Sequence, residues 1–234
     1  MSLGDEKIKD ICDLYADAPK LAEKGEIAIC ADEMTGIQAL ERISPDKPVQ
    51  PGSVAKREFE YKRNGTQTLI AGRDIASGKV VAMCQETRKE EDFVNFIKMY
   101  VEQNPEAVKL HFVADNLNIH LSESLVRYVA GCSSFNGELG IKGECGILKS
   151  MKSREEFLTN TSHKVVFHYT PKHASWMNQI EIWFGILNRK VIRRGNFTSP
   201  YDLKRKITNF IGYYNETSAK PFKWTYRGAI LTGH

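Results

Sequence analysis

Two short apolar runs, 26–31 and 110–114, are each followed at once by an aspartate, Asp32 and Asp115 respectively. Runs of this length are typical of strands buried on both faces, and they are too short to span a membrane. A segment that precedes the second run has its apolar residues at the spacing of one helix face: Phe93, Phe96, Ile97, Tyr100 and Val101. This alternation of strands and helices predicts an α/β fold.

The same patterns predict an order of elements along the whole chain. Ser77-Gly78 supplies the turn of a hairpin between the second and third strands. We expect an N-terminal helical segment, 1–25, before a single large domain, 26–234, that carries a Gly-rich insertion at about 131–162. The expected helices are 7–24, 90–103, 122–130, 176–194 and 200–214, the expected strands are 26–31, 66–71, 79–87, 110–114 and 164–169, and an extended loop with three prolines is expected at 43–64.

Composition argues against several classes of protein. The five cysteines are scattered and form no Cys-x-x-Cys pair, so neither a disulfide framework nor a zinc knuckle is indicated. No stretch approaches the ~18 uninterrupted apolar residues of a membrane span, and the N-terminus lacks the pattern of a signal peptide. We therefore expect an intracellular protein that does not enter the membrane. The net charge of +4 is only a weak indication of nucleic-acid binding.

A third acid, Glu181, lies beside the apolar stripe of the expected helix 176–194 rather than opposite it. Together with Asp32 and Asp115 it could form a carboxylate cluster, and carboxylates are the hard oxygen ligands that divalent cations prefer. Each acid also has an ordinary interpretation. An aspartate after an apolar strand is most often the first solvated residue of a loop, and a helix flank often carries a solvated acid.

The sequence motifs around the three acids decide between these interpretations. They read Ala31-Asp-Glu-Met-Thr-Gly, Ala114-Asp-Asn-Leu-Asn-Ile-His and Tyr169-Thr-Pro-Lys-His-Ala-Ser-Trp-Met-Asn-Gln-Ile-Glu. In this order they resemble the catalytic blocks of the DDE transposases of bacterial insertion sequences, in the branch related to mariner elements. The third block is the most specific, because it contains a strand end, a Pro-Lys-His turn and the helix that presents the last acid.

This resemblance implies a ribonuclease-H-like fold, a mixed five-stranded sheet with an antiparallel hairpin and flanking helices. It also implies that Asp32, Asp115 and Glu181 are catalytic and hold two Mg²⁺ ions, for which Mn²⁺ substitutes. Two such ions about 4 Å apart serve both ends of an in-line phosphodiester displacement. The implied activity is cleavage and strand transfer of DNA at transposon ends, by a homodimer or larger assembly in the cytoplasm, at the nucleoid.

Neighbouring residues supply further candidates. Asn116 and His120 follow the second acid and could orient it or a phosphate, although His120 could equally be a helix-start or packing residue. Glu33 should point to the other side of the strand from Asp32, which predicts a surface or salt-bridge residue. The candidate DNA contacts, which compete with solvated turn and helix-end positions, are Lys172, His173, Arg189, Lys190, Arg193 and Arg194.

The chain departs from the transposase pattern in two respects. Asp115 and Glu181 are 66 positions apart, more than is usual in this branch, and the excess matches the Gly-rich segment. Only about 25 residues precede the first strand, where such transposases carry a helix-turn-helix region, so we expect a catalytic fragment or partial copy. Two alternatives remain, a non-catalytic DNA-binding remnant and a ribonuclease-H-like nuclease. The intact acids argue against the first, and the Pro-Lys-His turn argues against the second.

Overall fold

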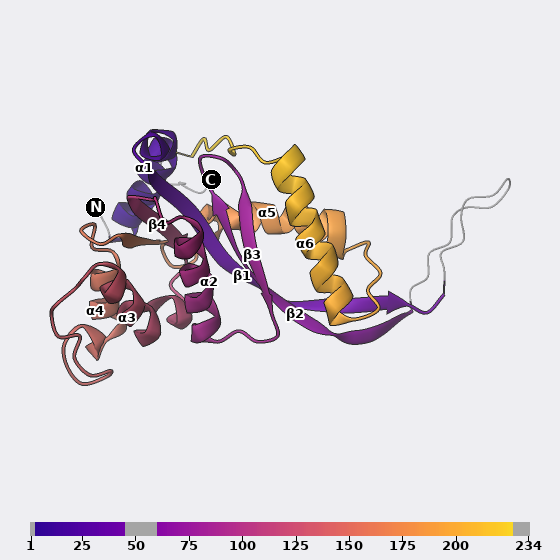
Figure 1. Cartoon of the computed structure of the whole chain (residues 1–234), viewed down its shortest axis with the longest axis horizontal. Helices are drawn as coiled ribbons and strands as arrows, with labels where there is room; N and C mark the ends of the chain where they lie inside the picture. The colour runs from indigo at the N-terminus through magenta and orange to yellow at the C-terminus, as the bar shows by residue number, and fades with distance from the viewer. Residues whose placement is uncertain (1–2, 45–59, 227–234) are drawn as a thin grey trace, which may run out of the picture.

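A twisted sheet of five strands runs through the molecule in the order β3-β2-β1-β4-β5 (Figure 1). The structure, a computed structural model, describes residues 3–44 and 60–226. Strand β2 is antiparallel to β1 and β3, whereas β4 is parallel to both β1 and β5. The strands are β1 (Glu26–Arg42), β2 (Tyr61–Asp74), β3 (Val80–Gln85), β4 (Lys109–Ala114) and β5 (Val165–Tyr169). This mixed sheet with an antiparallel hairpin confirms the expected ribonuclease-H-like fold class.

Helices cover both faces of the sheet, because successive residues of a buried strand point to opposite sides. In β1, Ala28 and Cys30 belong to one apolar core, and Ile29 and Ala31 belong to the other. The first core is closed by α1 (Leu3–Glu23), α5 (Ile180–Leu187) and α6 (Pro200–Thr217), and the second by α2 (Glu90–Gln103), α3 (Glu123–Cys132) and α4 (Met151–Leu158). Within the described ranges, none of the helices combines the length and the apolar character that a bilayer crossing requires.

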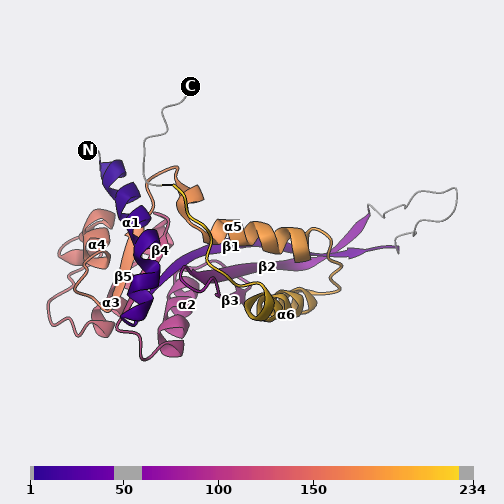
Figure 2. The same cartoon turned by 90° about the horizontal axis from the view of Figure 1, so that it is seen from above.

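Strand β1 is much longer than the apolar run that predicts it. Its pairing with β4 ends at Cys30, opposite Val113, while its pairing with β2 continues to Arg42. Beyond the end of β4 the two long strands form a ribbon that projects from the body of the molecule (Figures 1 and 2). The expected loop at 43–64 is therefore wrong at 61–64, which belong to β2, and its 45–59 portion lies outside the described residues.

Local signals account well for the hairpin and for two of the helices. The turn between β2 and β3 is closed by Asp74, whose Oδ1 accepts hydrogen bonds from the backbone N of Ala76 (2.8 Å) and Ser77 (3.1 Å). Gly78 follows in the left-handed region at φ 77°, which glycine adopts without strain. Helix α2 has the predicted bounds, and Ser122 caps α3 by accepting from the backbone N of Leu125 at 3.2 Å. These predictions are confirmed.

Two expected elements differ from the structure. The predicted continuous helix 176–194 is a 3-10 turn (Ser175–Met177), then α5, then a π-helical turn (Asn188–Ile192). The start of α5 is delayed because Asn178 is buried and donates its side-chain amide to the carbonyl of Ala31 at 3.0 Å. The segment 131–162, where a Gly-rich insertion is expected, contains α4, whose Leu158 is fully buried in the second core.

Candidate active site

Asp32 lies inside β1, two residues after the last pair that β1 forms with β4. It is only 6% exposed, so it is not the solvated loop residue of the ordinary interpretation. Its Oδ1 accepts from the backbone N of Glu33 at 2.8 Å, and its Oδ2 lies 3.5 Å from the amide nitrogen of Asn178. Burial raises the pKa of Asp32 to about 7, an effect to which repulsion by Asp115 adds and which the positive charge of His120 opposes.

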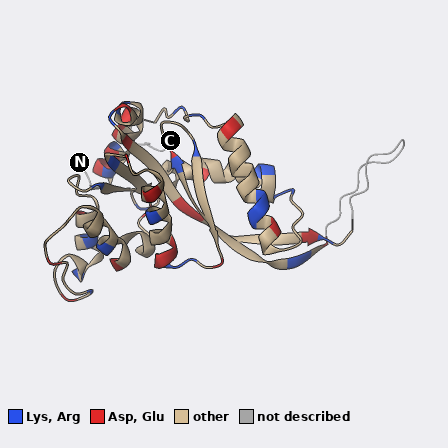
Figure 3. Ribbon diagram, in the orientation of Figure 1, with Lys and Arg blue, Asp and Glu red and all other residues tan. Residues whose placement is uncertain are grey.

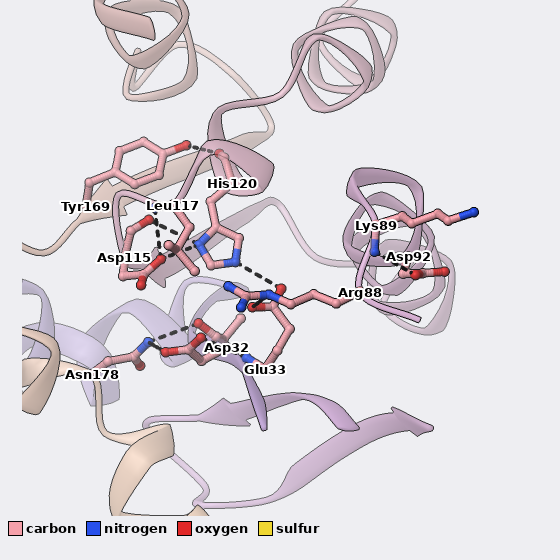
Figure 4. A network of polar contacts seen from close by, with 11 residues as sticks. Asp32, Glu33, Arg88, Lys89, Asp92, Asp115, Leu117, His120, Tyr169 and Asn178 are labelled. Atoms are coloured by element: carbon pink, nitrogen blue, oxygen red, sulfur yellow. Dashed lines mark hydrogen bonds and ion pairs between the residues drawn. The ribbon is translucent and has the colours of Figure 1, made fainter. Parts of the chain in front are cut away.

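Asp115 follows the last residue of β4 and is held by His120 (Figure 4). The Nδ1 of His120 donates to Asp115 Oδ1 at 2.6 Å, and its Nε2 donates to Glu33 Oε1 at 3.0 Å. Burial opposes a charged imidazole, but these two carboxylates outweigh it and raise the pKa of His120 to about 10. In the same way, burial would raise the pKa of Asp115, but the hydrogen bond and charge of His120 lower it. His120 therefore lies as a charged imidazolium between the carboxylates of Asp115 and Glu33.

The placement of Glu33 contradicts the surface position expected from strand alternation. Its side chain is 1% exposed and reaches His120 on the side where β4 has ended. Its Oε2 is buried without a hydrogen-bond partner among the described residues, and Arg88 Nε lies 3.9 Å from it as an ion-pair partner. The salt-bridge part of the prediction holds, because Glu33 pairs with His120. Alternation alone could not show that this face of the strand is covered.

Glu181 occupies the first turn of α5 and is exposed. Burial of part of its side chain raises its pKa, and the charge of Asp115 raises it further. Asp115 also raises the pKa of Asp32, so its charge acts on both other acids. The three carboxylates come from β1, the residue after β4 and the first turn of α5.

Two asparagines connect the segments that carry these acids. Asn116 donates its side-chain amide to the carbonyl of Thr170, which ties the residues after β4 to the turn after β5. Asn178 ties the start of α5 to β1 beside Asp32. Sequence reasoning missed Asn178 as a site residue, and the signal for it was its place three positions before Glu181, at the point where the predicted helix actually breaks.

The basic candidates all lie on the surface, but in two separate places. Lys172 and His173 occupy the exposed turn after β5, where His173 has a left-handed φ of 63°. The others follow the C-terminal end of α5, far along the helix from Glu181, and the segment after them packs on β1, where Phe197 N donates to Leu40 O at 2.8 Å. Figure 3 shows basic residues around this end of α5, near α6 and the ribbon of β1 and β2. The exposed residues there are Arg189, Lys190, Arg193 and Arg194.

The donors at this site fit a hard divalent cation. Ligand atoms of Asp32, Glu33 and His120 all lie within 4.8 Å of one another. Within the described part of the chain, Glu33 Oε2 and Asn178 Oδ1 are buried oxygens without hydrogen-bond partners, and a buried oxygen of this kind is costly to leave unpaired. Both nitrogens of His120 are already engaged by carboxylates, so this histidine positions acids and leaves the oxygens to bind metal.

The raised pKa of Asp32 predicts a pH-dependent cost in the metal-free protein. Its folded pKa of about 7 exceeds the ordinary 3.8, so between these values the folded state holds a proton that the unfolded chain has lost. The contribution of Asp32 to the free energy of unfolding is therefore fully present below about pH 4, and it is lost as the pH rises to about 7. In EDTA, the stability of Asp32→Asn minus that of wild type should grow from about zero at pH 4 to at most about 4 kcal/mol at pH 8. Urea unfolding measures it, and a pH-independent difference would contradict it.

Comparisons with known proteins agree with the motifs. A family model described as DDE superfamily endonuclease matches residues 28–204. No curated protein shows significant similarity. One similar solved structure is the Mos1 transposase paired-end complex with left transposon end, at 12% identity and a TM-score of 0.46, covering 91% of this chain and 55% of that one. The Mos1 Strand Transfer Complex has 10% identity and a TM-score of 0.42, and the match covers 91% of this chain and 56% of that one. The Mos1 mariner paired end complex with Mn has 15% identity and a TM-score of 0.34, and the match covers 95% of this chain and 65% of that one. The chain thus spans little more than half of the first two.

Proposed function

The chain belongs to the DDE superfamily endonuclease family, and on that premise we propose that it is a transposase catalytic domain that cuts DNA at transposon ends and joins the strands. The observation that carries the proposal is that the charge of Asp115, just after β4, acts on both Asp32 in β1 and Glu181 in α5. The three surrounding motifs support the finer assignment to transposases of the insertion-sequence type.

In this proposal each acid has a position suited to its task. Asp32 is central and rigid, because it lies in a buried strand and its Oδ1 is fixed by the backbone of Glu33. Asp115 is oriented by His120, and the more exposed Glu181 closes the site from the α5 side. When bound, two Mg²⁺ or Mn²⁺ ions supply activation of the attacking oxygen and stabilisation of the leaving oxygen.

DNA is the proposed substrate and partner. Lys172 and His173 lie in the turn that leads to α5, where they can reach a phosphate close to the acids. The four basic residues after α5 extend the proposed DNA track toward the ribbon of β1 and β2. We further propose that the chain acts as a homodimer or larger assembly, in the cytoplasm on nucleoid DNA.

A pair of measurements tests this function. The first is calorimetric titration of Mn²⁺ into wild type and Asp32→Asn, with circular dichroism to establish that both are folded; we expect binding that the variant loses. The second is Mn²⁺-dependent nicking of duplex DNA compared with hydrolysis of an RNA:DNA hybrid. Nicking of DNA alone supports the proposal. Preference for the hybrid would identify a ribonuclease-H-like nuclease, and a folded chain that binds DNA without Mn²⁺ binding or cleavage would identify a non-catalytic remnant.

A further inference from the structure

Two histidines of neighbouring parallel strands meet on the face of the sheet that α1 covers, outside the acidic site. His111 of β4 and His168 of β5 place Nδ1 and Nε2 at 3.0 Å from each other. The outer nitrogens each contact a carboxylate: His168 Nδ1 lies 2.6 Å from Asp10 Oδ2 of α1, and His111 Nε2 lies 2.8 Å from Glu26 Oε2 of β1. The result is a row of four groups in contact, in the order carboxylate, imidazole, imidazole, carboxylate.

The protons of this row can be counted. An ionised carboxylate only accepts hydrogen bonds, so both outer nitrogens must carry their protons. The Asp10 side chain is 55% exposed and the Glu26 side chain is 22% exposed, so both carboxylates also face water. In neutral imidazoles the two inner nitrogens are then bare, and two lone pairs face each other at 3.0 Å. A positive species is needed between them, either one extra proton or a cation.

Burial weighs against the extra proton. The histidine side chains are each 10% exposed, and burial lowers the pKa of His111, an effect that His168 and Lys109 reinforce and that Glu26 opposes. A metal ion, by contrast, binds imidazoles in the neutral form that burial favours. The outer carboxylates are the partners that metal-bound histidines ordinarily have, since a second-nitrogen bond to a carboxylate fixes the tautomer and strengthens the ligand.

We propose that His111 and His168 form a second cation site, which takes a divalent transition metal such as Zn²⁺ in place of a shared proton. At metal–nitrogen distances of about 2.0–2.1 Å, an N···N separation of 3.0 Å corresponds to an angle at the metal of about 95°, and an opening of about 0.4 Å gives tetrahedral geometry. The ion would offset the two negative charges of Asp10 and Glu26. It would also fasten α1 to three strands of the sheet.

Solvent reaches the His168 end of this pair. A cavity of about 390 Å³ between α1 and α4 is lined by Asp10 and His168, together with Tyr169 and Glu155. Its imidazole ligands distinguish the pair from the acidic site, because Mg²⁺ prefers oxygen donors while Zn²⁺ readily accepts nitrogen. The proposal stands independently of the catalytic function, since none of the three acids takes part in it.

The test is calorimetric titration of Zn²⁺ into the folded Asp32→Asn protein in the presence of Mg²⁺, which separates this site from the acidic one. We expect one equivalent to bind and to raise the melting temperature, and we expect Asp32→Asn/His168→Gln to lose that equivalent. The matched control is His173→Asn in the same background, because His173 is an exposed histidine and asparagine tolerates its left-handed φ of 63°. This control should bind Zn²⁺ as its parent does.

A milder variant guards against unfolding of the His168→Gln protein. Asp10→Asn leaves both imidazoles in place and removes only the charge on the outer nitrogen of His168, so Zn²⁺ affinity should fall about 10–100-fold. Equal binding by Asp32→Asn, its His168→Gln derivative and its Asp10→Asn derivative would overturn the proposal. So would a folded Asp32→Asn protein that binds no Zn²⁺, which would leave the pair with a shared proton.

Discussion

Asp32→Asn, Asp115→Asn and Glu181→Gln are each expected to abolish Mn²⁺-dependent DNA cleavage while the fold is retained. Each change keeps the shape of the side chain and replaces a charged ligand oxygen with a neutral amide. Losing several kcal/mol of charge stabilisation in the transition state lowers the rate by about 10³-fold or more. Single-turnover cleavage of duplex DNA measures the rate, and circular dichroism establishes that each variant is folded.

The matched control for this series is Glu216→Gln, which makes the same chemical change at an exposed position on α6. Its cleavage rate should equal that of wild type. The three variants should also differ in metal-free stability, because Asp32 carries the largest burial cost of the three acids and Asp115 is stabilised by His120. Full activity in any one variant would remove that residue from the site.

His120→Ala is expected to cause the largest loss of stability, about 3–5 kcal/mol, because it removes the partner of a buried carboxylate. Glu33, whose side chain is 1% exposed when His120 is present, would keep only the 3.9 Å ion pair with Arg88 among the described residues. The variant also empties the space beside Phe93, whose ring centroid lies 4.3 Å from that of His120. Urea unfolding in EDTA measures the loss, and Mn²⁺ affinity should fall at least about tenfold because Asp115 loses its orienting partner.

The double variant Glu33→Gln/His120→Ala separates the buried charge from the cavity. It has the same cavity as His120→Ala but replaces the unpaired carboxylate with a neutral amide. We expect it to be more stable than His120→Ala by about 2 kcal/mol. Equal stability of the two variants would mean that the cavity, and not the charge of Glu33, accounts for the loss.

The sequence predicts those parts of the molecule whose signals are local. The bounds of α2 follow from its apolar spacing, and the β2–β3 hairpin follows from Ser77-Gly78. The length of β1 could not be predicted, because after Asp32 the only alternating buried apolar residues are Ile37 and Ala39, and pairing with β2 holds the rest of the strand. Gly36 and the polar residues around it have low strand propensity, and they form a strand because they pair with β2.

The residues of the candidate site likewise divide into those that local motifs predict and those that they do not. The three acids could be selected because each stands in a recognisable motif, and the charge of Asp115 acts on both of the others. Glu33 and Asn178 could not be identified, because their roles depend on contacts with distant segments, His120 for one and Ala31 for the other. Alternation along a strand tells which side a residue faces, but it does not tell whether a loop from elsewhere covers that side.

The order of the three acids along the chain determines when all of them are present during synthesis. Asp32 and Glu181 are 149 positions apart, and the strand that precedes α5 is the last one of the sheet to be synthesised. A chain still emerging from the ribosome therefore has two of the acids long before the third, and domains fold as units once their residues are available. Translation that stops before α5 yields a product that lacks Glu181, so interrupted synthesis does not release a chain with the complete proposed site.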